Sequence, residues 1–447
     1  MAKIEHPAAP PLADLPERRP RAARAGPLLS RFDVTVQVVT PILGGSVQPR
    51  TVDEIDVIRP ATVRGHLRFW WRALHGHRYA TAEQLFDAES ALWGRAATDQ
   101  GGRSAVELAV QIERRSQKDG SNVSLGDTGA YALWPARETR ERGAVKDPAA
   151  PRWCPGIQVR FEFTVPAARA QEVRDTVRAW LLFGGYGGRT RRGVGSLTAL
   201  SDKEAWLPKA ASREEFQRLF GRDIFANAGA SRETPLLAGA RLFAGQPEPG
   251  AIRAWTAALG WLQDFRQGTR GAQGERAREP DPQGGKRASI SNWPEADKVR
   301  HLTGKTSGHT PRHNGTPAWP RAGFGLPIIG RFQKDGRNGR RLDEPEGFEL
   351  RWRSNGTEHD RLASPLIVKP LALANGQFVP IALWFTRALP PDARVFLKGV
   401  PDSDAPFDRL VAPGDTPRFK ALQGKTSLRD AFLDWLAETN RAKAVVR

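Results

Sequence analysis

Alternating apolar and polar residues predict the strands in the first half of the chain. From Phe32 to Val38 every second side chain is apolar, and polar residues occupy the positions between them. A period of two is typical of a strand with one buried face. Similar patterns predict further strands over residues 105–112, 157–165 and 196–200.

Apolar residues at helical spacing predict two helices between these strands. The sequence Arg59-Pro60-Ala61-Thr62 is typical of a helix start, because proline fits the first helical turn. The apolar residues that then fall on one side of the helix are Val63, Leu67, Trp70, Trp71 and Leu74. A second helix is expected over residues 167–183. The resulting order, strand-helix-strand-strand-helix-strand, is that of the ferredoxin-like motif.

The second half repeats this order with a larger interruption. We expect a strand near residues 236–243, a helix over 251–265 and a strand over 324–332. Two strands, 366–373 and 378–385, flank Asn375-Gly376, which is a strong signal for a type I′ hairpin turn. An amphipathic helix over residues 427–441 follows.

These elements predict an α+β protein with two ferredoxin-like (RRM-like, βαββαβ) domains in tandem, over residues 31–203 and 204–447. A long basic insertion in the second domain, residues 266–321, carries eleven Lys or Arg against five Asp or Glu. We expect it to be mobile or ordered by a partner. Residues 1–30 are rich in Pro, Ala and Arg and are expected to form a disordered leader.

A glycine-rich loop lies between the second helix and the last strand of the first half. The segment from Gly184 to Ser196 holds six glycines and three arginines in thirteen residues. Glycine lets a backbone approach a ligand closely, and arginine presents a planar set of donors that fits phosphate. Mononucleotide loops follow a strand and begin a helix. This loop has the reverse order, so we interpret it as wrapping a polynucleotide; a flexible surface connection is the alternative.

The charge of the chain supports a polyanionic partner. A formal net charge of +19 makes nucleic acid the first candidate. A membrane surface is the alternative, but no apolar run approaches the roughly 20 residues that span a bilayer. The single cysteine, Cys154, excludes an intramolecular disulfide and a multi-cysteine zinc site. We therefore expect a cytoplasmic protein without membrane association.

A basic stripe accompanies the apolar side of the first helix. It consists of Arg64, Arg68, Arg72 and His75, which have few acidic residues four places away to pair with. Charged helix faces are commonly just solvated, but the lack of local partners favours contact with RNA. His66 lies beside this stripe, and we expect it to contact phosphate or to pack rather than to act as a general base.

No group of residues stands out as a catalytic or metal site. Gly304-Lys305-Thr306 and Gly424-Lys425-Thr426 lack the first glycine of a phosphate-binding P-loop. His359-Asp360 lacks further ligands at suitable positions, and His301, His309 and His313 lie in a polar segment. We expect no catalytic residue, no metal and no cofactor. Most of the fourteen tryptophans occupy apolar helix positions and are expected in the core rather than stacked on bases.

Two strings in the first half resemble the RAMP (repeat-associated mysterious protein) superfamily of CRISPR systems. They are Thr40-Pro41-Ile42-Leu43-Gly44-Gly45 and the run from Ile58 to Ala73. More narrowly, they resemble the first RAMP subunit of the type III-B (Cmr) effector complex. The glycine-rich loop is similar to the signature loop of the superfamily. Later motifs of the same subunit resemble residues 291–300, 324–328, 363–366 and 369–370.

This resemblance implies two ferredoxin-like domains and a position near the 3′ end of the CRISPR RNA, where the subunit helps to engage target RNA. It implies CRISPR RNA, target RNA, other RAMP subunits and the large subunit as partners. It also implies a non-catalytic role in antiviral defence, because target cleavage belongs to the repeated backbone subunit and the polymerase and HD activities to the large subunit. The predicted RNA-binding residues are Arg59, Arg64, His66, Arg68, Arg72, Gly184, Gly185, Gly187, Gly188, Arg189, Arg191, Arg192, Gly193, Lys298, Arg300 and Lys369.

Two alternatives remain open at this point. One is a metal-independent endoribonuclease that processes CRISPR RNA, with His66 as base and a nearby arginine stabilising the pentavalent intermediate. The other is a structural cap held by protein contacts alone. The first predicts cleavage of repeat RNA in the presence of a chelator, and the second predicts that the isolated chain has no affinity for RNA.

Overall fold

A computed structural model describes residues 28–96, 101–141, 143–227, 233–267, 278–279, 290–308, 310–332 and 342–446. Within these residues the protein is a mixed α/β structure with antiparallel sheets. The expected disorder of the leader falls almost wholly outside the described residues, and so do His309 and most of residues 268–289.

The first sheet has the strand order β3-β8-β1-β9. Its strands are β1 (Leu29–Val38), β3 (Glu107–Arg114), β8 (Gln158–Pro166) and β9 (Leu197–Ala199), and every neighbouring pair is antiparallel. Helices α1 (Pro60–His75) and α4 (Ala170–Phe183) pack against it. Helix α1 begins at Pro60, and the five apolar residues predicted on one side of it are all buried.

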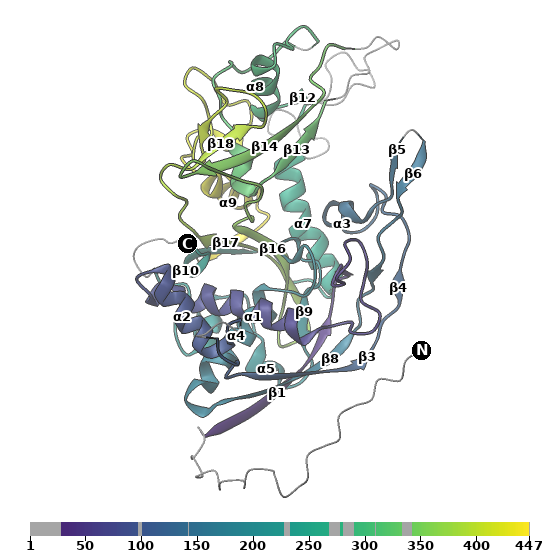
Figure 1. Ribbon diagram of the computed structural model, residues 1–447, viewed down its shortest axis with the longest axis vertical. Coiled ribbons are helices and arrows are strands. Elements are labelled where there is room, and N and C mark those ends of the chain that lie inside the picture. Colours follow the sequence, from purple (N-terminus) through teal and green to yellow (C-terminus); the bar gives the residue numbers. More distant parts are fainter. Residues whose placement is uncertain are drawn as a thin grey trace, which may run out of the picture.

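The second sheet has the order β16-β17-β10-β20. Its strands are β10 (Leu236–Ala244), β16 (Leu366–Ala372), β17 (Phe378–Thr386) and β20 (Lys443–Val446). Helix α7 (Ala251–Gln267) packs on β16 and β17, while α1 contacts β10 and α4 contacts β16. Helices α1 and α4 therefore lie between the two sheets, as the stacked layers of Figure 1 show. Because both faces of the second sheet are covered, its strands β16 and β17 are nearly continuous apolar runs.

The two halves share a hydrophobic core. One cluster of buried side chains includes Val34 and Phe161 of the first sheet, Trp70 of α1, and Leu242 and Ile367 of the second sheet. A second cluster joins the other face of the second sheet to α7 and to α9 (Leu428–Glu438). The core is therefore continuous across the predicted division between residues 203 and 204.

A third sheet, not predicted as such, lies beyond α7 at the top of Figure 1. It has the order β13-β14-β18-β19, with β15 paired to β14. The strands are β13 (Ile328–Arg331), β14 (Gly347–Ser354), β15 (Thr357–His359), β18 (Arg394–Leu397) and β19 (Ala405–Pro406). The strand predicted over residues 324–332 is shorter than expected, because Pro320–Phe324 forms a 3-10 turn.

The described part of the predicted insertion is ordered by contacts within the chain. Helix α8 (Glu295–Leu302) carries Lys298, which forms a buried ion pair with Asp415. Its neighbour Asp297 accepts a hydrogen bond from the ring of His313 at 2.9 Å. These contacts join residues far apart in sequence, so the expectation that residues 290–308 and 310–321 are mobile or need a partner for order is wrong.

The remaining elements are short or peripheral. They are α2 (Ala82–Trp93), α3 (Ala130–Leu133), α5 (Lys203–Trp206), α6 (Arg213–Phe220), β2 (Ile42–Leu43), β4 (Lys118–Asp119), β5 (Thr139–Glu141), β6 (Ala144–Asp147), β7 (Arg152–Trp153), β11 (Arg278–Glu279) and β12 (Ile290–Ser291). Helix α2 packs on α1, and α3 contacts α7.

Asn375-Gly376 and Asn355-Gly356 each connect two paired strands, but they form different turns. Strands β16 and β17 do form the hairpin predicted at Asn375-Gly376, but only Gly376 has a positive φ, at +87°. A type I′ turn needs positive φ at both central residues, so the predicted turn type is wrong. Asn355 and Gly356, with φ of +48° and +70°, meet this requirement between β14 and β15.

Lys369 fixes the helix layer to the second sheet. It lies in β16, is fully buried, and donates hydrogen bonds from Nζ to the carbonyls of Leu181 (3.3 Å) and Leu182 (2.9 Å) in the last turn of α4. Burial lowers the pKa of Lys369 to about 7. A side chain with no exposed surface cannot contact RNA, so the predicted RNA-binding role of Lys369 is not supported, and it is left out of the interface below.

The pH dependence of stability tests this placement of Lys369. Between pH 7 and 10.5 the folded protein binds fewer protons at this site than the unfolded chain, so stability rises with pH by up to about 1.4 kcal/mol per unit. We expect the melting temperature of the wild type to rise relative to that of Lys369→Met between pH 7 and 9.5. If the melting temperatures of the two proteins changed with pH in the same way over this range, the buried position and lowered pKa of Lys369 would be contradicted.

Candidate nucleic-acid interface

The glycine-rich loop is packed into the protein rather than open. Tyr186, at its centre, is fully buried, and its N–H donates to the carbonyl of Gly195 at 2.9 Å. The Tyr186 hydroxyl accepts a hydrogen bond from the backbone N–H of Arg59, also at 2.9 Å. The N–H of Gly188 donates to the carbonyl of Leu43 at 2.7 Å. The loop is thereby tied to the start of α1 and to β2.

Thr40 connects the end of β1 to the same loop. Its hydroxyl donates to the carbonyl of Gly193 at 2.6 Å and accepts from the N–H of Ser196 at 2.8 Å. The N–H of Gly195 donates to the carbonyl of Pro41 at 2.8 Å. The Thr40-Pro41 string, singled out in the sequence, thus serves to hold the glycine loop.

The glycines of the loop allow close contacts within the protein. Gly195 has a φ of +68°, and an added Cβ would lie 1.9 Å from the carbonyl oxygen of Tyr186. Added Cβ atoms would lie 2.5 Å from Trp70 at Gly184, 2.8 Å from the Gly195 carbonyl at Gly185, and 2.6 Å from Trp255 at Gly193. Gly184, Gly185 and Gly193 are buried, so the expectation that they approach RNA is not supported. Gly188 is exposed, and Gly187 is partly exposed.

The three arginines of the loop differ in their exposure and hydrogen bonds. Arg189 is exposed and has a φ of +58°. Arg191 donates to the carbonyl of Ser364 and lies 5.5 Å from the Phe69 ring centroid, while Arg192 donates to the carbonyl of Leu366 at 3.2 Å. Among the described residues, none of the three forms an ion pair with a carboxylate.

These arginines line a cavity of about 1050 Å³ together with two further cations. The added residues are Arg266 of α7 and Arg321, which fell in the basic segment but were not singled out by sequence. Among the described residues that line it, Asp127 is the one carboxylate, and its side chain accepts a hydrogen bond from the N–H of Ser124. Arg321 lies 3.2 Å from the buried Glu295. The cavity therefore carries a strong excess of positive charge.

The pKa values of two of these arginines are lowered mainly by burial and further by neighbouring arginines. Burial, with a smaller contribution from nearby Arg387, lowers the pKa of Arg191 to about 10. Burial and then repulsion by Arg266 lower the pKa of Arg192 to about 9. Both guanidinium groups stay charged at neutral pH. An anion in the cavity would relieve this repulsion.

The basic stripe on α1 is largely paired within the protein. Arg68 and Arg72 both form ion pairs with Glu89 of α2, at 2.5 and 2.6 Å. Arg59 pairs with Asp53 and holds the pKa of that carboxyl below its usual range. Few acidic residues do lie four places away along α1, but the arginines are not left unpaired, because Glu89 comes from another helix. Arg64 is partly exposed and has no hydrogen bond or ion pair to any described residue.

The two histidines of α1 near the basic stripe, His66 and His75, are uncharged at neutral pH. The ring of His66 lies 6.2 Å from that of Trp180 and 5.8 Å from that of Tyr186. Burial lowers the pKa of His66 to about 4 and, with repulsion by Arg78, that of buried His75 to about 3. Both rings are therefore neutral at pH 7, which removes the charge expected to contact phosphate.

Lys298 and Arg300 lie in the buried polar network of α8. Lys298 is fully buried and donates to the carbonyl of Asn314 at 2.8 Å in addition to its ion pair. Arg300 pairs with Asp297 at 3.0 Å and with Glu344 at 2.8 Å. Their charges are neutralised by carboxylates of the same chain, so the expected contacts of these two residues with RNA are not supported.

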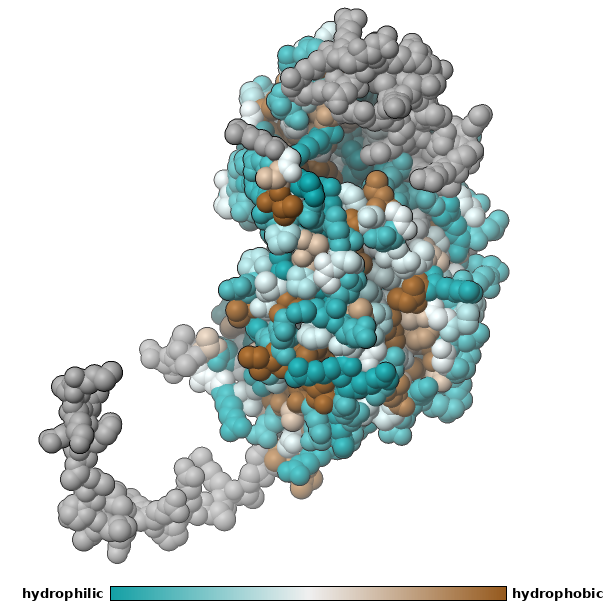
Figure 2. All heavy atoms as spheres, turned by 90° about the vertical axis from the view of Figure 1, so that its right-hand side faces the viewer, coloured by the Kyte–Doolittle hydropathy of each residue, from teal (hydrophilic) through white to brown (hydrophobic). Residues whose placement is uncertain are grey.

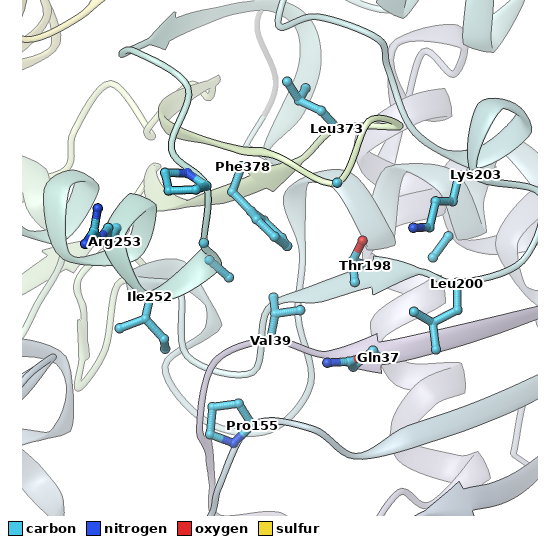
Figure 3. Close-up of a pocket in the computed structure, with 15 residues that line it drawn as sticks. Gln37, Val39, Pro155, Thr198, Leu200, Lys203, Ile252, Arg253, Leu373 and Phe378 are labelled. Atoms are coloured by element: carbon cyan, nitrogen blue, oxygen red, sulfur yellow. The ribbon is translucent and has the colours of Figure 1, made fainter.

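A second cavity, of about 530 Å³, lies beside β9 and the start of α7 (Figure 3). It is lined by apolar side chains such as Val39, Leu200 and Phe378, with Lys203 and Arg253 at opposite ends of the view. It contains none of the residues predicted to bind RNA. Among the described residues no group of three His, Cys, Asp or Glu side chains forms a candidate metal site.

The face that carries α3 and the β5–β6 hairpin is mostly hydrophilic, with separate hydrophobic areas between the polar side chains (Figure 2). Within the described part of the chain, no helix is both long and apolar enough to span a bilayer.

Comparison with known proteins finds a family model that matches part of the first half of the chain. The RAMP superfamily model matches residues 35–198, which extend from β1 to β9, and so confirms the resemblance found in the sequence. A comparison with curated proteins finds no match.

Three solved structures are similar to this chain at low sequence identity. Cmr1 from Pyrococcus furiosus in its apo form is 15% identical, with 81% of this chain and 89% of that chain covered and a TM-score of 0.45. A chain of type III-B Cmr-beta bound to cognate target RNA and AMPPnP is 10% identical, with 93% and 100% covered and a TM-score of 0.43. A chain of Cmr-beta bound to cognate target RNA is 11% identical, with 81% and 97% covered and a TM-score of 0.39.

Substitution of loop glycines tests whether their role is packing. Gly195→Ala places a Cβ against the Tyr186 carbonyl at a positive φ, so we expect a loss of about 2–4 kcal/mol of stability. The control is Gly65→Ala, at an exposed site in α1 where an added Cβ meets nothing within 4 Å. It should gain up to about 1 kcal/mol. Equal urea-unfolding midpoints for the two variants would contradict the packed loop.

Proposed function

We propose that this chain, whose residues 35–198 match the RAMP superfamily, is an RNA-binding subunit of a type III-B CRISPR effector ribonucleoprotein. The observation that carries the RNA-binding part is the cavity lined by Arg189, Arg191, Arg192, Arg266 and Arg321. Assignment to a type III-B complex rests on the sequence motifs described above. The bound strands are guide and target RNA near the 3′ end of the CRISPR RNA.

Electrostatics favours a nucleic-acid strand as the ligand of this cavity. Buried or half-buried like charges destabilise a protein unless an anion or a carboxylate neutralises them. Here the guanidinium groups of Arg189, Arg191 and Arg192 lack carboxylate partners among the described residues. A strand with regularly spaced phosphates can neutralise several of them at once and release its counterions.

Both halves are proposed to be ferredoxin-like domains. In the first, the chain order β1-α1-β3-β8-α4-β9 combines with the sheet order β3-β8-β1-β9. In the second, β10-α7-β16-β17-α9-β20 combines with β16-β17-β10-β20, which is the same arrangement. The parts inserted between α7 and β16 include the third sheet's β13 and β14 and the basic segment.

We further propose that the chain is not a nuclease. His66, the base of the endoribonuclease alternative, has a pKa of about 4 because it is buried, and its ring lies near those of Trp180 and Tyr186. A general base works best when its pKa is near the working pH. At neutral pH His66 would accept a proton only weakly.

Replacement of Arg189 tests the interface with little risk to the fold, because its side chain forms no hydrogen bond or ion pair with the described residues. With a single-stranded RNA, four to six phosphate contacts predict a slope of log K against log salt of roughly −3 to −4 for the wild type. We expect Arg189→Ala to weaken binding about tenfold and to make the slope shallower by about 0.7. Fluorescence anisotropy at several salt concentrations measures both.

The matched controls separate local contact from overall charge. Alanine at Arg189, Arg191 and Arg192 together removes three charges from the cavity. Alanine at Arg103, Lys209 and Lys398, which are exposed and paired with surface carboxylates, removes three charges elsewhere. Equal losses in the two triple variants would contradict the interface. If the wild type had no affinity for RNA, the alternative of a structural cap held by protein contacts would be favoured.

Incubation with RNA tests the non-catalytic proposal. We expect the wild type to leave CRISPR repeat RNA intact in the presence of a chelator, and His66→Ala to behave in the same way, as judged on denaturing gels. Cleavage by the wild type that His66→Ala abolishes would replace this proposal with the endoribonuclease alternative.

A further inference from the structure

Trp134 differs from every other tryptophan of the chain. All fourteen lie in described residues, and thirteen of them are buried. Trp134 is partly exposed and lines the basic cavity that also holds Arg189. A partly exposed aromatic ring beside arginines that lack carboxylate partners costs hydrophobic free energy in the free protein. Its exposure therefore points to a ligand with a flat, apolar face.

The segment around Trp134 is held rigidly in place. The guanidinium group of Arg50 donates to three backbone carbonyls near it, those of Pro135, Arg137 (2.9 Å) and Pro148 (2.6 Å). The guanidinium carbon of Arg137 lies 4.4 Å from the Trp134 ring centroid. A ring fixed in this way loses little conformational entropy when a ligand stacks on it.

Tyr131 is a second partly exposed aromatic residue in the same lining. It lies one helical turn before Trp134, and its hydroxyl accepts a hydrogen bond from Arg266 at 3.0 Å. Arg266 also lies 5.7 Å from the Phe324 ring centroid. The hydroxyl of Tyr131 is thus bonded to α7.

We infer that the cavity takes unpaired nucleotides, whose bases stack on Trp134 and Tyr131 while their phosphates contact Arg189, Arg191 and Arg192. This inference rests on the proposed function and specifies its ligand as single-stranded RNA. The cavity volume of about 1050 Å³ is at the upper end of small-molecule pockets, so it encloses a nucleotide or two and excludes a duplex. In a duplex the base faces are covered by their neighbours, so only unpaired bases can stack on protein rings.

The rim of the cavity fits the same ligand. Leu125 and Ile329 line it and are 84% and 72% exposed. Apolar side chains beside cations suit a strand that alternates apolar bases and charged phosphates. Stacking on aromatic side chains tolerates every base, so the site should show little sequence preference.

Binding of a uridine 12-mer, its abasic analogue and a duplex of the same length tests this inference with the full chain. We expect the single strand to bind roughly 5- to 100-fold more tightly than the abasic strand. Trp134→Leu should remove most of that difference, leaving abasic binding and the salt slope unchanged. Tyr131→Phe should retain binding, because it keeps the ring.

The control variant is Phe86→Leu, which alters an aromatic side chain that is 48% exposed on α2, outside the cavity. It should bind like the wild type. Equal affinities of the wild type for the intact and abasic strands would overturn the stacking inference, even if Trp134→Leu fails to fold. If the two affinities are equal but binding still depends on salt with the expected slope, the proposed function stands. If the wild type binds none of the strands, the stacking inference and the proposed function are both overturned.

Discussion

The end of helix α4 is the point on which the junction of the two sheets depends. Its last turn is buried, so the carbonyls of Leu181 and Leu182 need donors that water cannot supply. Lys369 of the second sheet supplies them. Burial of the ammonium group opposes this arrangement and lowers its pKa to about 7. The contact persists because unpaired buried carbonyls would also destabilise the fold.

The position of the glycine-rich loop depends on that junction. Gly193 and Gly195 pack against Trp255 and Tyr186, where any side chain would collide. The indole of Trp255 donates to the carbonyl of Arg192 at 2.7 Å, so α7 holds the loop from the second half of the chain. With its backbone fixed from both halves, the loop presents its arginines to one cavity. Rigid placement of this kind reduces the entropy lost on binding.

The basic residues fall into two groups with different physical roles. Arg68, Arg72, Lys298 and Arg300 form ion pairs with buried or nearly buried carboxylates, and these pairs hold neighbouring elements together. The arginines of the glycine loop bond instead to carbonyls or to no described residue, which leaves their charge uncompensated. A net charge of +19 does not distinguish the two groups. The second group is the one that an RNA strand can use.

The sequence by itself determined the main strands, the helices and the buried side of α1, because apolar periodicity reports which face of each element meets the core. It also determined the RAMP resemblance, through motifs that are contiguous in the chain. Only the tertiary structure decided which cations are free, because Glu89 and Asp415 lie 21 and 117 residues from the arginine and lysine they pair with. For the same reason it alone showed that loop glycines pack on Trp70 and Trp255, and that Trp134 is left at the surface of a basic cavity. Such contacts depend on where distant segments meet, which no local pattern specifies.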